Sequence, residues 1–510
     1  MHSFVKKSIY TAVMLACAQT AAAGTDVFFN PLTQSAAVAQ VANHINELNS
    51  PWQVPAGVTY KNLTSLHEIE ADPEQSTVRV DNLGASASMT DMSAFDPTGR
   101  YIFIPHETGV GAGLTRYDME EDKAINLFKG DGSGDWESDY GALDPATWTP
   151  NNTLLIGEEW SGQGRLFEVE NPMADPDDII VTELNSVPNV SHEGLRFNHD
   201  GSAFYFVDED RSGSIYKFVP SVAGDYSKGQ TFVLSVHAYT DDVSAQPAKY
   251  PNNNPAGRSG MATWVPMTDV DGIKLTEVDP FDNETRGGRA AADELNGTPF
   301  RRPEDVEVGY LKNGHEALYF TATEELAVYS VEELGNNEAM VRLFADESTL
   351  KNVGHTATTG KIDSPDNLAQ GALGNIYIVE DWPNRDNVGG DVWFVRDTNN
   401  DGVAESVDHF MSLQVKGAEN TGMIFNPANP TQFIINVQHP ESTSIDGGMG
   451  DATWLLDLKD VVAPVCASKD NESEEDREHH GKRYDKHNKI KTCSNSADTN
   501  FTKKLIKAGK

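Results

Sequence analysis

The stretch FRRPEDVEVGYLKNGHEALYFTATEE, residues 300–325, decides the fold. Its alternation VEV at 306–308, a turn-rich gap and the run ALYFT at 317–321 predict the two strands of a β-hairpin. Pro303 excludes a helix here, because proline lacks a backbone donor and favours an extended preceding residue. The charged residues expected at the mouth of this hairpin are Arg302, Glu304 and Asp305.

A unit of this kind recurs about every 50 to 60 residues. Each copy starts with a carboxylate, crosses a short strand, turns at Asp, Asn or Gly, and returns in an aromatic-rich strand that ends in another acidic or imidazole group. Six copies predict an all-β fold, a six-bladed β-propeller, because a closed ring of blades leaves few exposed strand edges. The copies begin near residues 91, 139, 192, 300, 365 and 419.

These copies place the propeller domain at residues 85–462, after an N-terminal extension at 24–84. The gap between the third and fourth copies is about twice the others, so either a blade is cryptic or residues 225–298 form an insertion. We favour an inserted loop region, because 251–260 and 279–296 have the composition of loops.

Both ends of the chain differ in composition from the propeller. Residues 1–23 predict a signal peptide, in which two lysines precede an apolar run too short to span a bilayer and three alanines offer a cleavage site. We therefore expect a periplasmic or secreted protein without a membrane span. Residues 463–510 form a short charged tail, in which Cys466 and Cys493 would pair as one disulfide.

The chain is strongly acidic, with a net charge of −39 and an isoelectric point near 4.6. This charge argues against nucleic acid and anionic membranes as partners. A solvated acidic surface explains most of the carboxylates, and calcium or a saline medium is the alternative. No G-x-S-x-G elbow and no Walker loop occurs, so serine-triad hydrolysis and nucleotide binding lack support. We expect a monomer.

The acidic residues that begin or end the repeated units would converge at one mouth of the propeller, because equivalent strands line its axis. Close carboxylates raise one another's pKa and cannot all stay ionised without cations. A cluster of oxygen-bound metals, with calcium as the first candidate, resolves this conflict; the alternative is that the carboxylates close loops by bonding backbone amides. The candidate ligands are Glu107, Glu158, Glu193, Glu304, Asp366 and Glu419.

Arg302 stands beside Glu304 among these residues. A guanidinium in such surroundings can bind a tetrahedral oxyanion such as phosphate with two hydrogen bonds. A structural ion pair with a neighbouring carboxylate is the alternative. His192 and His439 adjoin the same group, either as hydrogen-bonded core residues or as ligands.

A second candidate site follows the calcium-loop pattern D-x-[DN]-x-DG. Oxygen ligands at alternate positions wrap one Ca²⁺, and the glycine supplies a sharp turn. We expect this ion to pin a blade loop. The predicted ligands are Asp397, Asn399, Asp401, Glu405 and Asp408.

The ordered motifs RPEDVEV, SPDNLAQGALGNIYIVED, GAENTG with VQHP, SHEGLRF and PHE resemble the PhoX-type family of alkaline phosphatases, over roughly residues 85–445. The resemblance implies a six-bladed propeller whose axial mouth holds iron and calcium ions and hydrolyses phosphate monoesters, so the substrate would be a small phosphorylated molecule. It also implies that the six candidate carboxylates bind metal and that Arg302 contacts phosphate. The metal ions would stabilise the developing charge.

The chain departs from that family in two respects. Gly157 takes the place of the family's iron-binding cysteine, before Glu158 and Glu159. Because a thiolate favours iron, a centre of calcium alone is the alternative to Fe³⁺. The family also often carries a twin-arginine export signal, whereas Lys6 and Lys7 favour general secretion.

Two other functions fit the same pattern. A calcium-dependent lactonase or phosphotriesterase would need one essential calcium and would act on lactones but not on phosphate monoesters. A non-catalytic calcium-stabilised propeller scaffold would release no phosphate even when fully loaded with metal. An exported metal-dependent phosphatase remains the leading hypothesis.

Overall fold

The computed structural model describes most of the chain between residues 28 and 461. The signal peptide expected at 1–23, the tail at 463–510 and the disulfide expected between Cys466 and Cys493 lie outside the described residues. The described ranges are 28–38, 50–66, 90–160, 163–239, 255–282, 286–371, 374–381, 387–444 and 448–461.

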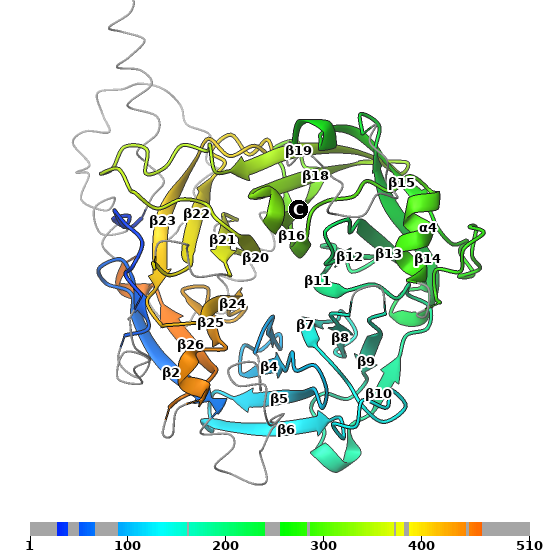
Figure 1. Cartoon of the computed structure of the whole chain (residues 1–510), viewed down its shortest axis with the longest axis horizontal. Helices are drawn as coiled ribbons and strands as arrows, with labels where there is room; N and C mark the ends of the chain where they lie inside the picture. Colours follow the sequence, from blue (N-terminus) through cyan, green and yellow to red (C-terminus); the bar gives the residue numbers. More distant parts are fainter. Residues whose placement is uncertain are drawn as a thin grey trace, which may run out of the picture.

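Within these residues the strands form six antiparallel blades around a central axis, in chain order (Figure 1). The first strand of each blade is innermost. The first blade contains β3 (Ala94–Phe95), β4 (Tyr101–Pro105), β5 (Gly113–Asp118) and β6 (Lys123–Lys129). The second contains β7 (Leu143–Trp148), β8 (Leu154–Glu158), β9 (Leu166–Val169) and β10 (Val181–Glu183). The third contains β11 (His192–Phe197), β12 (Phe204–Asp208), β13 (Ile215–Val222) and β14 (Asp225–Val236).

The last three blades repeat this order, and two of them gain a strand from the N-terminal part of the chain. The fourth contains β16 (Pro303–Tyr310), β17 (Glu316–Ala322), β18 (Ala327–Gly335) and β19 (Glu338–Asp346). The fifth contains β20 (Pro365–Gln370), β21 (Ile376–Glu380), β22 (Asp391–Arg396), β23 (Ser406–Leu413) and β1 (Trp52–Gln53). The sixth contains β24 (Glu419–Phe425), β25 (Gln432–Gln438), β26 (Ala452–Asp457) and β2 (Thr59–Ser65).

The prediction of an all-β six-bladed propeller is confirmed by this topology. The middle strands are apolar on both faces, because each blade packs between two others; β21, for example, is buried along its whole length. No helix among the described residues is long and apolar enough to cross a membrane.

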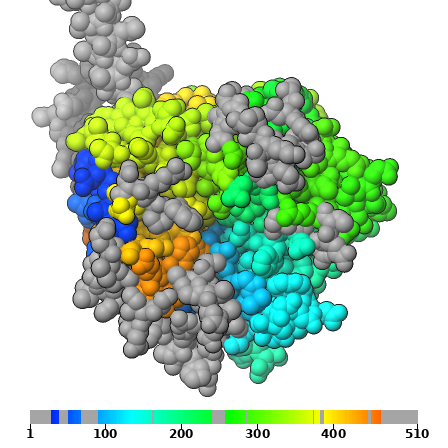
Figure 2. All heavy atoms as spheres, in the orientation of Figure 1, coloured from blue at the N-terminus to red at the C-terminus, as the bar shows by residue number. Residues whose placement is uncertain are grey.

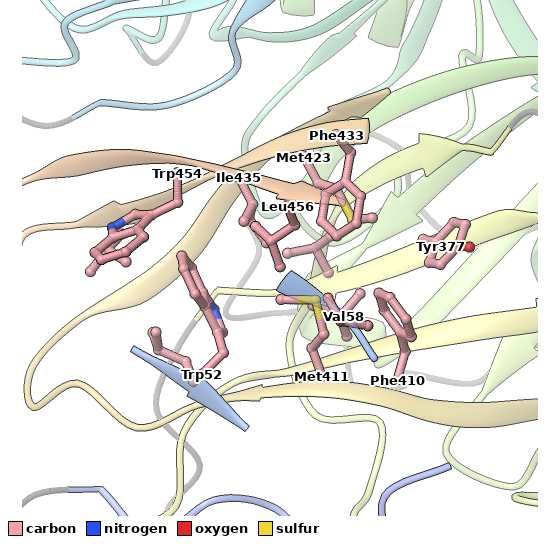
Figure 3. Close-up of a cluster of buried hydrophobic side chains, with 14 of the residues drawn as sticks. Trp52, Val58, Tyr377, Phe410, Met411, Met423, Phe433, Ile435, Trp454 and Leu456 are labelled. Atoms are coloured by element: carbon pink, nitrogen blue, oxygen red, sulfur yellow. The ribbon is translucent and has the colours of Figure 1, made fainter. Parts of the chain in front are cut away.

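The N-terminal residues close the ring. β2 pairs with β26, and β1 pairs with β23, so part of the expected extension at 24–84 completes two blades. Trp52 packs edge-on against Trp454, with ring centroids 5.8 Å apart, in the core between those blades (Figure 3). In Figure 2 the atoms of the first blade lie beside those of the last, as closure requires.

The region between the third and fourth blades differs from the expected insertion at 225–298. Residues 225–236 belong to the third blade as β14, and β15 (Gly260–Pro266) then joins β14 to β19. α4 (Gly287–Glu294) replaces part of the loop expected at 279–296. This helix forms because Ala291 and Ala292 pack into the apolar core of the third blade.

Candidate metal and phosphate site

A β-bulge near the start of the innermost strands aims one residue per blade away from the regular ladder. The pairing of each first and second strand slips by one residue in all blades whose register the structure describes. Bulges re-aim side chains in this way beside functional sites. The residues that directly follow the last paired residue before the slip are Asp91, Asp144, Glu193, Glu304, Asp366 and Gly422.

Five of these six positions therefore carry a carboxylate, and the sixth blade carries Gly422. No side chain fits at Gly422, since a Cβ there would lie 2.5 Å from the backbone oxygen of Asp91. Its φ of 60° also favours glycine.

In the second to fifth blades, a second set of residues directly follows the second strand, which pairs with the innermost strand. Their backbone N–H groups donate to the carbonyl of the residue just before the inner strand, which fixes both sets relative to each other. The donors and acceptors are Glu159 and Ala142 (2.8 Å), Glu209 and Ser191 (2.9 Å), Thr323 and Arg302 (2.9 Å), and Asp381 and Ser364 (3.3 Å).

Two groups of three carboxylates could each hold a cation, with one oxygen of each residue lying within 4.8 Å of the others. The first group is Asp144, Glu159 and Glu193, and the second is Glu193, Glu304 and Asp366. Glu193 belongs to both groups. We refer to these five residues as the axial cluster.

The electrostatics of the axial cluster favour bound cations. Burial, followed by the charge of neighbouring carboxylates, raises the pKa of Asp144, Glu159, Glu193 and Asp366 well above the usual range. Burial also raises the pKa of Glu304 to about 8, although the Arg302 guanidinium opposes this shift. Without cations these groups cannot all be ionised. The donors are all carboxylate oxygens, which suit hard cations such as Ca²⁺.

Glu304 gives the most direct sign of a missing partner. It is fully buried, and neither of its carboxylate oxygens accepts a well-aligned hydrogen bond among the described residues. Arg302 Nε lies 3.0 Å from Oε1. A buried carboxylate with free lone pairs is costly unless a cation or a water binds it.

Arg302 occupies a position that is small in the other blades where the equivalent hydrogen bond occurs, namely Ala142, Ser191 and Ser364. We expected an extended residue before Pro303, but the φ of Arg302 is 52°, which lets its carbonyl accept the N–H of Thr323. Its side chain is 30% exposed, and Nε contacts Glu209 at 2.5 Å.

The fourth blade also carries Thr323 where the second, third and fifth blades carry a carboxylate. A cation and a neutral residue thus make this side of the cluster the least negative.

Three of the six sequence-predicted carboxylates lie in the axial cluster, and the other three do not. Glu193, Glu304 and Asp366 come together in the axial cluster. Glu107 lies near it, and burial raises the pKa of Glu107 to about 7, but its carboxylate accepts a hydrogen bond from Gln438 at 2.8 Å. Glu419 instead forms an ion pair with His439 and belongs to neither group of three.

Glu158 does not face the axis, and its neighbour Glu159 does. Side chains alternate along a strand, so only one of two adjacent residues can point inward. Glu158 is buried against Arg165, with Nη2–Oε1 at 2.6 Å and Nε–Oε2 at 2.7 Å. Sequence reasoning also missed Asp144, whose signal is its place directly after the first paired residue of an inner strand.

The two histidines differ in state. Burial lowers the pKa of His192 to about 3, and neither ring nitrogen has a hydrogen-bond partner among the described residues. Burial lowers the pKa of His439, but its contact with Glu419 outweighs this and raises the pKa to about 10, so His439 carries a positive charge.

Gly157 packs directly against His192. A Cβ at 157 would lie 2.7 Å from the His192 Cβ, so a cysteine does not fit there in this arrangement. The axial cluster offers oxygen donors only, which matches calcium better than thiolate-bound iron.

The carboxylates of the predicted calcium loop accept hydrogen bonds from within the loop itself. Asp397 accepts N–H groups from Asp401 at 3.1 Å and Gly402 at 2.8 Å, and Glu405 accepts the amide of Asn399 at 2.6 Å. Asp408 cannot join this loop, because it is buried in β23 with its carboxylate 2.7 Å from Arg396.

The family described as alkaline phosphatase PhoX matches residues 139–441. No curated protein matches the sequence.

Among solved structures, one shares the fold at low sequence identity, and two others are similar at lower TM-scores. PhoX from Pseudomonas fluorescens, in complex with vanadate, a transition state analogue, is 13% identical with a TM-score of 0.58, over 85% of this chain and 99% of that chain. A protein of unknown function from Bacteroides thetaiotaomicron is 9% identical with a TM-score of 0.41, over 78% of this chain and 76% of that chain. The PQQ-bound aldose sugar dehydrogenase from Streptomyces coelicolor is 13% identical with a TM-score of 0.37, over 79% and 99% of the two chains.

Proposed function

This chain belongs to the PhoX family of alkaline phosphatases and is a phosphoric monoester hydrolase, and we propose that it hydrolyses its substrate at the axial cluster. The observation that carries this proposal is the arrangement of two groups of three carboxylates that share Glu193. Arg302, beside Glu304, adds a cation at a position filled by small residues in three other blades.

The proposed division of roles follows from charge. Arg302, partly exposed and adjacent to Glu304, binds phosphoryl oxygens through its planar guanidinium. The axial cluster holds oxygen-liganded cations, for which Ca²⁺ is the best fit and Fe³⁺ the alternative. Such cations would supply positive charge to the phosphoryl oxygens.

The reaction adds water to phosphorus and breaks the P–O bond to the alcohol. Glu193 contributes to both groups of three, so it sets the spacing of the two positions. Burial of Asp144, Glu193, Glu304 and Asp366 limits the access of bulk water and strengthens the charge interactions among them. Glu209 orients Arg302 through its 2.5 Å contact.

We further propose a secondary role for two carboxylates and a calcium site in one loop. Glu107 and Glu419 line the same mouth as secondary carboxylates, and the loop containing Asp397, Asp401 and Glu405 binds one structural Ca²⁺. We also propose that the chain is exported and monomeric. Cell fractionation and size-exclusion chromatography test these two points.

The proposed function is tested by turnover of p-nitrophenyl phosphate before and after chelation. We expect turnover to stop on chelation and to return when Ca²⁺ is added back. Metal-replete protein that releases no phosphate would refute the proposal, and hydrolysis of lactones alone would favour the lactonase.

A further inference from the structure

Two tryptophans that lie close in sequence to residues of the axial cluster have no part in the roles above. Trp160 directly follows Glu159, and its ring centroid lies 5.9 Å from that of Trp136 at an interplanar angle of 61°. Both indoles meet at Gly141, where a Cβ would lie 2.7 Å from Trp160 Nε1 and 3.0 Å from Trp136 Cη2. Glycine at 141 thus permits their close approach, three residues before Asp144.

The loop that carries Glu107 packs against one side of this aromatic pair. A Cβ at Gly109 would touch the Trp160 ring at 3.9 Å, and the Gly109 carbonyl lies 2.8 Å from the Cβ position at Gly141. One side of the pair is therefore bounded by the backbone that leads to Glu107, Asp144 and Glu159. A group stacked on the pair would therefore lie near the chain segments that carry these carboxylates.

Trp136 is exposed on a rigid loop. The buried carboxylate of Asp139 accepts backbone N–H groups from Gly111 at 2.9 Å and Gly134 at 2.7 Å, as well as from Gly132 and Tyr140. Arg165 donates to the Trp136 carbonyl at 2.8 Å. Trp136 nevertheless remains 44% exposed.

Two neighbours fix the orientation of the Trp136 ring. The Arg165 guanidinium lies 5.8 Å from the ring centroid, and Trp160 meets the ring at a steep angle. A rigid aromatic ring that is supported on these sides and open to solvent can stack on a ligand without a further loss of conformational entropy. Packing alone accounts for Trp160, which is partly buried, but leaves the exposure of Trp136 unexplained.

We propose that Trp136 and Trp160 form a subsite for an aromatic group in the alcohol part of the phosphate monoester. This inference rests on the proposed function, because the phosphoryl group must lie at the axial cluster for the alcohol to reach the two indoles. It makes the chain selective for aryl-bearing monoesters over small alkyl ones.

The test compares 2-phenylethyl phosphate with ethyl phosphate, whose leaving alcohols have similar acidity and differ by a phenyl ring. We expect the ratio of their kcat/KM values to favour the phenyl ester in the wild type and to fall about three- to tenfold in Trp136→Ala, the range of one aromatic pair. Trp136→Phe should keep most of the ratio. An unchanged ratio in Trp136→Ala would overturn the proposal.

Tyr310→Ala is the matched control. Tyr310 is also an aromatic residue with 40% exposure, but it stacks on His199 at the outer end of β16, so its loss should leave the ratio unchanged. A wild type that hydrolyses neither ester would refute the proposed function. The subsite would then be judged by calorimetric binding of phenylphosphonate, which Trp136→Ala should weaken by the same factor; equal binding to both proteins would overturn it.

Discussion

At the scale of single residues, the axial cluster depends on carboxylates that are buried beside one another. Glu304 shows this dependence most clearly, because its oxygens lack well-aligned hydrogen-bond partners among the described residues and burial raises its pKa to about 8. An amide has nearly the same shape but no charge with which to bind a cation.

We therefore expect Glu304→Gln to lower phosphatase turnover about a hundredfold or more while the protein stays folded, since losing a ligand costs at least as much as losing its supporting partner. Turnover of p-nitrophenyl phosphate and circular dichroism measure the two effects. Unchanged turnover would contradict a role for Glu304 at the reacting centre.

Glu158 and Glu159 form a matched pair of adjacent residues with different surroundings. Glu159→Gln should weaken cation binding about tenfold or more, because its carboxylate belongs to the axial cluster. Glu158→Gln should leave cation binding unchanged but lower the free energy of unfolding by about 2 kcal/mol, because it weakens a charged contact with Arg165. Calcium titration and urea unfolding distinguish the two; the reverse pattern would contradict the assignment.

The sequence predicts much of this site and misses a specific part. Glu193, Glu304 and Asp366 were identifiable because each follows the first residue of a clear strand. The choice between Glu158 and Glu159 was not, because a shift of one residue reverses the direction of every side chain on a strand. Glu419 resembled the others in sequence, but its charge is taken by His439, which only three-dimensional proximity reveals.

At the scale of secondary-structure elements, the bulges place the site and the N-terminal strands close the ring. The hairpin at 300–325 was predictable from its alternation and its turn, and it forms β16 and β17. The insertion was less predictable, because β15 gains stability from pairing with β19, a strand distant in sequence, rather than from local pattern. The same holds for β1 and β2, whose partners lie more than three hundred residues away in sequence.

Trp52 tests the closure of the ring. It is 1% exposed, packs on Trp454 and donates its indole N–H to Asn420 at 2.7 Å. We expect Trp52→Ala to lower the free energy of unfolding by about 3 to 5 kcal/mol, the usual cost of such a cavity. Urea denaturation measures it, with the exposed Val222→Ala as a control that should change stability by less than about 0.5 kcal/mol. A loss as small as the control's would contradict closure through this strand.

At the scale of the whole molecule, the gathered carboxylates couple folding to cations and to pH. Glu107 and Glu304 have folded-state pKa values of about 7 and about 8, both above the value of 4.5 for an ordinary Glu. A raised carboxyl pKa means that the folded state binds protons more tightly than the unfolded state. The contribution of these protonated groups to stability is present below about pH 4.5 and is lost as the pH rises through 7 to 8.

The metal-free protein should therefore lose thermal stability as the pH rises from 5 to 8. Saturating Ca²⁺ should remove this loss, because bound cations replace the protons. Melting temperatures of chelated and calcium-loaded protein across this range measure the effect. A melting temperature of the chelated protein that rises or stays constant would show that the carboxylates do not repel one another.

The central claim is that carboxylates from separate blades gather cations on the propeller axis, and Glu193 is the residue that both groups of three share. The most direct measurement is the metal content per chain of the purified wild type and of Glu193→Gln, by elemental mass spectrometry after dialysis. We predict at least two ions per wild-type chain, one for each of the two groups, and the loss of both in the variant. A variant that retains the full wild-type content would contradict the account.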